Sequence, residues 1–325
     1  MNKLRLAVAS LALGAVLYMA LAPVSSAGPT DTPSNAVPAS PVPATGTNAQ
    51  ARLAPQDDLS KQIQTWIDSM AVQPGFEAWK YAQWTHYALG PGTHGWVVIL
   101  KQAGDEVGYL VVSATPEGSW TLTEYGTGSS PLFSLTTLYR SLVQLALIAD
   151  PIDPSSSETV TLPSDLVIER LYHSPLHALW KVIPPAAGEA STIYIDAKTG
   201  EQLPLSPDPW RRLPSPTATG LPADTAAPRI ENALELEGFD PFHHTSWLRG
   251  TPLKLANFAQ LQQALRADSS VTYVADLYDR RVLAPFAVTG YAVWAGASVP
   301  FIRLEQEGSR YIPLQELFEN GFFFP

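Results

Sequence analysis

The sequence predicts an α+β fold of two domains, each an antiparallel sheet with packed helices, joined by a proline-rich linker. Short β-rich runs are separated by turn residues, amphipathic helical stretches flank groups of these runs, and two proline-rich segments divide the chain. The expected divisions are a signal peptide (1–27), a disordered spacer (28–55), a first domain (56–202), a linker (203–229) and a small second domain (230–325).

The first 27 residues are typical of an export signal. Lys3 and Arg5 precede an uncharged, mostly apolar stretch, and Ser25-Ser26-Ala27 supplies small residues at the expected cleavage point. An uncleaved anchor is the alternative, because the apolar stretch is near the shortest length that crosses a bilayer. We expect a protein that is secreted or associated with the cell surface, with membrane contact only if the leader is uncleaved.

The two proline-rich segments are not expected to form part of a packed core. Residues 28–55 contain six prolines and no aromatic residue, and residues 203–228 contain seven prolines. Such segments bury too little apolar surface to offset the entropy lost on ordering. We expect the first to be a spacer and the second to separate the domains.

The first domain is expected to begin with a helix packed on an antiparallel meander. Apolar residues recur at helical spacing along one stripe, which consists of Leu59, Ile63, Trp66, Ile67 and Met70. The strands that follow are separated by tight-turn residues. They are expected at 79–89, 96–100, 107–113 and 120–125.

The rest of the first domain should contain a second helix and a short sheet. Leucines recur along 132–148, and Pro151 prevents the helix from continuing. Residues rich in β-branched and aromatic side chains then predict strands at 166–172, 178–183 and 192–195.

The second domain should be a smaller α+β unit. Asn257 and Gln260 have the spacing of a capping box, ahead of a helix that ends near Arg266. Strands are expected at 271–275, 286–294 and 301–304, and a short helix at 314–319.

A strand, a loop and a second strand ending in Asp-Ala-Lys-Thr-Gly-Glu (196–201) resemble the terminal hairpin of PepSY-type modules and of related secreted peptidase propeptides. Residues 108–113 and 120–126 similarly resemble the propeptide or inhibitor portion associated with streptopain-like peptidases. In the hairpin, Asp196 and Thr199 can bond local backbone groups, and Gly200 allows the positive φ of a tight turn. The resemblance implies a small sheet-and-helix unit that inhibits or chaperones a peptidase.

The second domain is similar, over Phe286-Ala-Val-Thr-Gly-Tyr291, to the C-terminal half of papain-like bacteriocin-processing peptidases. The chain has no cysteine, and no histidine follows His244, so both members of a Cys/His pair are missing. The resemblance therefore implies a catalytically inactive relative.

Composition excludes several further classes of function. The net charge is −10, and cationic residues form no cluster larger than Arg211-Arg212 or Arg280-Arg281, so nucleic acid is not an expected partner. The absence of cysteine removes disulfides, thiol nucleophiles and thiolate metal sites. We expect no cofactor and no metal.

Asp240, His243 and His244, followed by Ser246, form the densest polar stretch and are the candidate catalytic residues. Members of a catalytic triad normally converge from separate elements, whereas side chains this close in sequence diverge. A surface loop is the preferred interpretation. His173 and His177 have the spacing of helical metal ligands, but on an extended strand they would lie roughly 13 Å apart, too far to share one ion.

Aromatic residues of the first sheet are the candidate binding residues: Trp79, Tyr81, Trp84 and Trp120. Alternation along a strand places Trp79 and Tyr81 opposite Trp84, so one group is exposed unless both faces of the sheet are covered. The leading hypothesis is an exported, non-enzymatic binding or peptidase-inhibitory, chaperone-like protein, whose partner is a secreted peptidase or a cell-wall component. The alternatives are an exported hydrolase that uses Asp240, His243 and His244, and a structural module of the cell wall.

Overall fold

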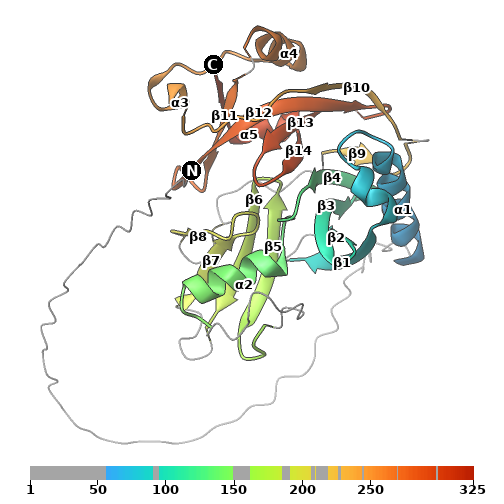
Figure 1. The fold of residues 1–325 in the computed structure, drawn as a ribbon, viewed down its shortest axis with the longest axis vertical. Coiled ribbons are helices and arrows are strands. Elements are labelled where there is room, and N and C mark those ends of the chain that lie inside the picture. The colour runs from blue at the N-terminus through green and yellow to red at the C-terminus, as the bar shows by residue number, and fades with distance from the viewer. Residues whose placement is uncertain are drawn as a thin grey trace, which may run out of the picture. The chain divides into compact units, whose positions relative to one another are not determined.

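Three units, each a helix followed by four consecutive antiparallel strands, make up most of the structure (Figure 1). The computed structural model describes residues 56–90, 95–148, 162–184, 191–205, 209, 219–225, 228–243, 245–268, 270–297 and 299–325. The signal peptide and the whole spacer expected from the sequence lie outside these residues, as do 14 of the 27 residues of the expected linker.

The first unit contains α1 (Gln56–Ala71), the 3₁₀ helix η1 (Glu77–Tyr81), β1 (Gln83–Leu89), β2 (Gly95–Gln102), β3 (Asp105–Ala114) and β4 (Trp120–Thr127). The second unit contains α2 (Leu135–Gln144), β5 (Val167–Ser174), β6 (His177–Ile183), β7 (Ile193–Asp196) and β8 (Gln202–Leu203). The third unit contains α4 (Phe258–Ala267), β11 (Thr272–Leu277), β12 (Val282–Trp294), β13 (Phe301–Glu305) and β14 (Ser309–Pro313). The remaining elements are β9 (Leu221–Pro222), β10 (Ile230–Glu235), α3 (Ser246–Arg249), α5 (Leu314–Asn320) and β15 (Gly321–Phe324).

The first and third units share one sheet, so the fold is α+β but the two-domain expectation is not confirmed. The strand order is β1-β2-β3-β4-β14-β13-β12-β11-β15, with β9 paired to β4 and β10 to β12. The seam between the units is the antiparallel pairing of β4 with β14, where Tyr125 stacks on Tyr311 with ring centroids 4.6 Å apart. The two strands approach closely at Gly126. A side chain would not fit there, because a Cβ would stand 2.5 Å from the carbonyl oxygen of Ser309.

Part of the expected linker belongs to this sheet. Leu221 and Pro222 pair with β4, and the Leu221 side chain is fully buried. The Ala223 amide also donates to the carbonyl of Trp120 at 2.9 Å. The described residues 219–225 are therefore packed against the first unit rather than separating two domains.

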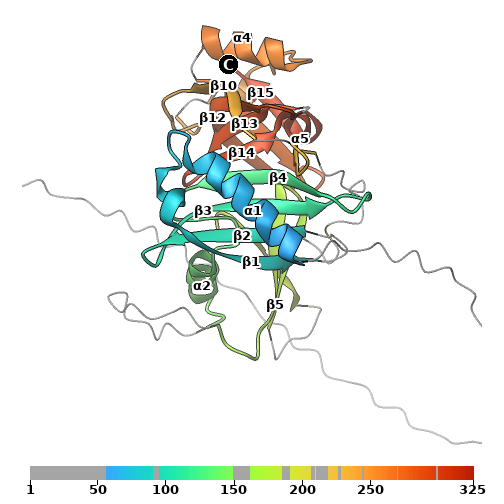
Figure 2. The ribbon, with the colours of Figure 1, turned by 90° about the vertical axis from the view of Figure 1, so that its right-hand side faces the viewer.

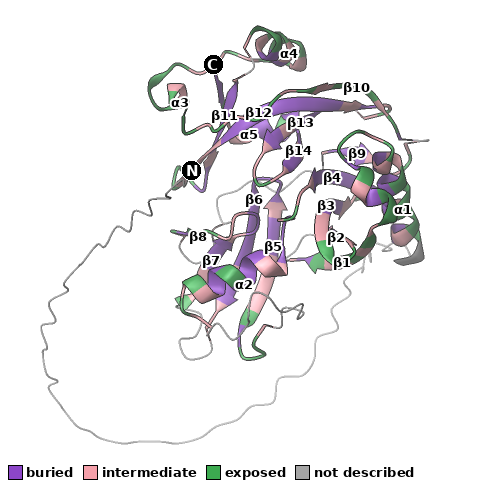
Figure 3. Cartoon of the chain, in the orientation of Figure 1, coloured by how far each residue is buried: buried purple, intermediate pink, exposed green. Residues whose placement is uncertain are grey.

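Each pair of units shares a hydrophobic core. The core beneath α1 lies on one face of β1–β4 and includes Trp294 and Phe301 from the third unit. Figure 2 shows α1 crossing that face. The second unit covers the opposite face with residues such as Trp180, and Leu179 joins Phe286 in a core between the second and third units. Figure 3 shows the resulting concentration of buried residues along the central strands.

Local patterns predicted the helices well. All five residues of the apolar stripe of α1 are buried, as expected. The side chain of Asn257 accepts from the amide of Gln260 at 3.1 Å, which confirms the cap of α4. Ser134 caps α2, whose observed bounds are shorter at both ends than the expected 132–148. Among the described helices, none has the length and apolar character needed to cross a membrane.

One expected strand begins too early. Residues 79–81 belong to η1, and the strand begins only at Gln83. The alternation argument for Trp79 and Tyr81 therefore does not apply, because their directions are set by a 3₁₀ helix. Both faces of the first unit's sheet are nevertheless covered. The helix α1 covers one face, and the second unit covers the other.

Candidate functional site

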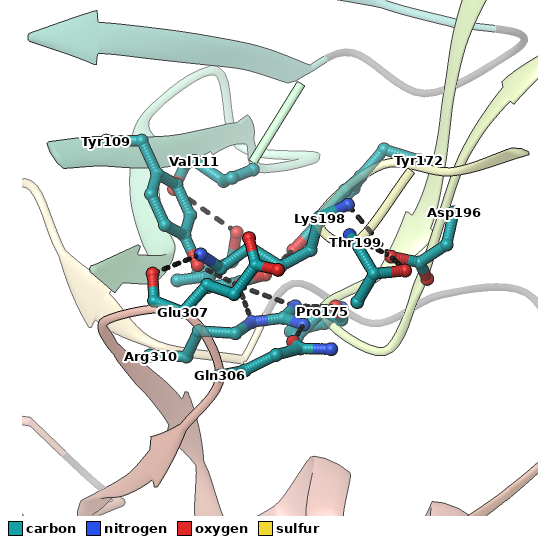
Figure 4. Close-up of polar contacts among 12 residues, drawn as sticks. Tyr109, Val111, Tyr172, Pro175, Asp196, Lys198, Thr199, Gln306, Glu307 and Arg310 are labelled. Atoms are coloured by element: carbon teal, nitrogen blue, oxygen red, sulfur yellow. Dashed lines mark hydrogen bonds and ion pairs between the residues drawn. The ribbon is translucent and has the colours of Figure 1, made fainter. Parts of the chain in front are cut away.

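The densest cluster of buried polar side chains lies where the three units meet (Figure 4). Its centre is the ion pair of Glu124, on β4, with Arg310, on β14. The Arg310 Nε and Nη2 atoms lie 2.9 and 2.8 Å from the same oxygen, Oε1, of Glu124. The side chains of Glu124 and Arg310 are 0% and 4% exposed, so the pair is sealed from solvent.

Two tyrosines complete the environment of the carboxylate. The hydroxyl of Tyr109, on β3, donates to Glu124 Oε1 at 2.5 Å. The hydroxyl of Tyr172, on β5, donates to Oε2 at 3.3 Å. Both carboxylate oxygens are therefore hydrogen-bonded, and one of the donors comes from the second unit.

Arg310 links the third unit to the second as well as to the first. Its Nη2 donates to the carbonyl of Pro175 in the β5–β6 turn at 2.6 Å. Its Nη1 donates to the Gln306 side chain at 2.6 Å. The guanidinium thus forms hydrogen bonds to all three units. Arginine suits this position better than lysine, because its planar group presents several donors in fixed directions.

The Asp-Ala-Lys-Thr-Gly-Glu turn supplies a second buried cation, Lys198. Asp196 accepts from the amides of Lys198 and Thr199 at 2.9 and 2.8 Å, and Gly200 has a φ of +75°. The turn is therefore built as its sequence predicts. It directs the Lys198 ammonium onto the carbonyls of Ser130, at 2.5 Å, and Glu307, at 2.9 Å.

Burial dominates the electrostatics of this junction. Burial, and then the neighbouring Arg310, lower the pKa of Lys198 to about 8. For Arg310 burial also disfavours the charge, but the attractions of Glu124, Tyr109 and Asp196 outweigh it and raise the pKa above its ordinary value. Burial raises the pKa of Tyr109 and Tyr172 well above the ordinary value, and the charge of Glu124 adds to this, so both hydroxyls remain donors.

The geometry of the junction indicates a structural role, which is to hold the three units together; we call it a structural lock. Glu124, Tyr109, Arg310 and Lys198 are each no more than 3% exposed. Their polar atoms are bonded to one another, to main-chain carbonyls, or to the side chains of Tyr172 and Gln306. A reacting group would need access to a free acid, base or nucleophile, and this cluster offers none to solvent.

A second buried polar pair closes the turn between β5 and β6. Ser174 Oγ and His177 Nδ1 lie 3.0 Å apart, and the two residues are cross-strand partners. The His177 ring packs edge-on against Tyr278, with centroids 5.0 Å apart, and is 2% exposed. His173 and His177 flank this turn with ring centroids 6.1 Å apart, so the expected separation along one extended strand was wrong. No group of three or more ligating residues suits a metal within the described part of the chain.

The candidate catalytic residues do not form a triad in the part of the chain that the structure describes. His243 Nε2 lies 3.6 Å from Asp240 Oδ2, and both side chains are largely exposed. The hydroxyl of Ser246 donates to the carbonyl of Pro325 at 2.5 Å. His244 lies outside the described residues.

The four candidate binding residues are divided by burial. Trp79 and Trp120 are core residues, 1% and 6% exposed. Tyr81 is 71% exposed, and Trp84 is half-buried, with its indole donating to Gln64 at 3.0 Å. Only Tyr81 and Trp84 are available for contact with a partner.

Comparisons with known proteins add no family. No protein-family model, curated protein or solved structure matches this chain. The resemblances to PepSY-type modules and to papain-like peptidases thus stay predictions from short motifs. They rest on the 196–201 turn, on residues 108–113 and 120–126 in β3 and β4, and on residues 286–291 in β12.

Sequence reasoning missed the junction. Glu124 stands out as the one charged residue of β4, and a charge that is buried requires a partner. The partner, Arg310, lies 186 positions away, and no local spacing connects the two.

We predict that Arg310→Met destabilises the protein by about 3–5 kcal/mol, because it leaves the Glu124 charge buried without its cation. The double variant with Glu124→Gln should lose less than the sum of the two single losses. Chemical denaturation gives both quantities. Arg229→Met is the control, since this exposed arginine pairs with Glu231 at 3.5 Å and should cost less than about 1 kcal/mol. Equal losses for Arg310→Met and Arg229→Met would contradict a structural lock.

We also predict that His177 makes stability fall in acid. Burial, and then the nearby His173, lower the pKa of His177 to about 3 in the folded protein. Its ordinary pKa is 6.5, so between these values the unfolded chain binds the extra proton and stability decreases as the pH falls. This site should contribute about 1.4 kcal/mol per pH unit over most of that range.

The measurement is the free energy of unfolding between pH 6 and pH 4.5 for the native chain and for His177→Gln. The variant should show a shallower loss of stability with falling pH. His243→Gln changes a side chain that is 83% exposed and serves as the control. Parallel pH profiles for the native chain and His177→Gln would refute the assignment.

Proposed function

We propose that this is an exported, non-enzymatic protein that binds or inhibits a secreted peptidase through the edge of its large sheet. The observation that carries the proposal is the terminal position of β1 in the sheet, although just past its end Gly90 exchanges main-chain hydrogen bonds with Arg170 and Tyr172 of β5. This strand is the last in the sheet order, and its partner along Gln83–Leu89 is β2. An edge strand presents unpaired main-chain groups to which an extended segment of another protein can add.

The composition of β1 favours such an addition. Natural sheets protect exposed edges with lysine, proline or other charged residues. The strand reads Gln-Trp-Thr-His-Tyr-Ala-Leu and contains no lysine, arginine, acid or proline. The exposed Tyr81 and the half-buried Trp84 lie at its start and supply aromatic surface of the kind enriched in binding hot spots.

Export and a peptidase partner are supported by sequence alone. The leader at 1–27 and the resemblance of 196–201 to secreted propeptide hairpins both favour them. The sealed state of the polar junction supports a non-enzymatic role, because the strongest concentration of titratable side chains is committed to holding the units together.

The test is inhibition of purified secreted peptidases, one of the papain-like cysteine class and one of the serine class, measured with a fluorogenic peptide. We expect the full chain to inhibit at least one of them. Tyr81→Ala combined with Trp84→Ala should weaken inhibition at least tenfold, whereas Phe242→Ala, which alters another exposed aromatic, should not. Absence of inhibition and of direct binding to both peptidases would refute a peptidase partner, and cosedimentation with purified cell walls would then favour a wall ligand.

The exported hydrolase is the competing function, and the contact of His243 with Asp240 is the observation in its favour. Replacing His243 and His244 with alanine tests it. Loss of a measured hydrolytic activity in a folded variant would favour the enzyme, and unchanged activity would exclude this pair of histidines.

A further inference from the structure

Arg170, on β5, has a cationic side chain with no anionic partner among the residues that the structure describes. Its guanidinium carbon lies 4.4 Å from the ring centroid of Tyr87, on β1, and 4.8 Å from that of Trp180, on β6. Within the described residues it takes part in no ion pair and no side-chain hydrogen bond, and its Nε atom is buried without a partner. The two rings hold the guanidinium in place but satisfy none of its five donors.

A second donor in the same stack is also unsatisfied. Trp180 is 1% exposed, and its indole Nε1 has no hydrogen-bond partner among the described residues. Four buried side-chain atoms of the described chain are unpartnered, and two of them lie on Arg170 and Trp180, which contact each other. Buried donors are normally satisfied, so this pair needs an explanation.

We propose that Arg170, Tyr87 and Trp180 form a binding site for a carboxylate. An arginine stacked on aromatic faces keeps its in-plane N–H groups free, and their spacing matches a carboxylate in a bidentate contact. Arg170 is half-buried as a residue, so part of its side chain can be reached from solvent. The site is independent of the proposed function, although Tyr87 places it beside the edge strand β1.

The surroundings favour a single planar anion over a phosphate dianion. Arg170 is the one cation that the described contacts place in the stack, and the chain as a whole has a net charge of −10. A dianion generally requires more than one cation or a helix N-terminus. The nearest acid in sequence, Glu169, pairs with Lys181 at 3.4 Å. Since neighbouring residues on a strand face opposite sides, that pair lies on the other face.

Burial supports the same conclusion. It lowers the pKa of Arg170 from its ordinary value, and the attraction of Tyr87 offsets only part of this effect. A bound carboxylate would supply the missing counter-charge and accept from the Nη groups of the guanidinium, because Nε and the Trp180 indole are sealed from solvent.

The test is titration of the full chain at pH 7 and constant ionic strength with sodium acetate, followed by the assigned indole N–H resonance of Trp180. A saturable shift is expected with acetate, and none with the neutral isostere acetamide. Arg170→Met should weaken acetate binding at least tenfold. Lys181→Met changes a cation on the neighbouring strand and should alter binding less than twofold.

Arg170→Lys guards against loss of folding in the methionine variant. It keeps the charge but not the bidentate geometry, so it should bind acetate more weakly than the native chain while remaining folded. Two further titrations identify the source of the carboxylate. Tighter binding of N-acetylglutamic acid α-amide than of acetate would indicate an acidic protein side chain, and equal binding a small organic acid. No saturable shift with acetate, or the same shift in a folded Arg170→Met protein, would overturn the proposal.

Discussion

The ion pair between Glu124 and Arg310 is the contact on which the arrangement of the three units depends. Polar groups of all three units meet there: Glu124 from the first, Tyr172 and Pro175 from the second, and Arg310 from the third. Removing two charges from water is unfavourable, and only close geometry with satisfied neighbours offsets it. The tyrosine hydroxyls and main-chain carbonyls supply those neighbours. The pair therefore specifies one docking geometry among the many that apolar surfaces alone would permit.

Apolar packing provides the main stabilisation around this lock. Three cores are each shared by two units, so none of the units buries its apolar faces fully by itself. Lys198 adds a second polar bond between units from the Asp196–Glu201 turn. A motif that is purely local in sequence thus contributes a long-range contact. Glu124, Arg310 and Lys198 are engaged in holding the units together, whereas the ligand contacts that we propose lie elsewhere, at the edge of β1 and at the Arg170 stack.

The sequence predicts what depends on local spacing and fails where distant segments determine the result. The stripe of α1, the cap of α4 and most strands of the three meanders follow from periodicity and turn residues. Leu221 and Pro222 belong to a strand of two residues, which is too short to show alternation, and their partner β4 lies about a hundred residues earlier. Trp79 is of a residue type common in strands, but it belongs to the 3₁₀ helix η1. Of the site, the sequence indicated the isolated acid Glu124 and the turn at 196–201 that carries Lys198, but not their partners, because topology determines which groups meet a buried charge.

We infer that the three units form one cooperative structure held together at a buried polar junction. Native-state hydrogen exchange of the full chain tests it most directly, by comparing the opening free energies of amides in β3, β6 and β12, one strand from each unit. We expect the most protected amides of all three strands to open with the same free energy. In Arg310→Met this opening free energy should decrease by the same amount in all three strands. A β6 that opens at a much lower free energy than β3 and β12 in the native chain would contradict it.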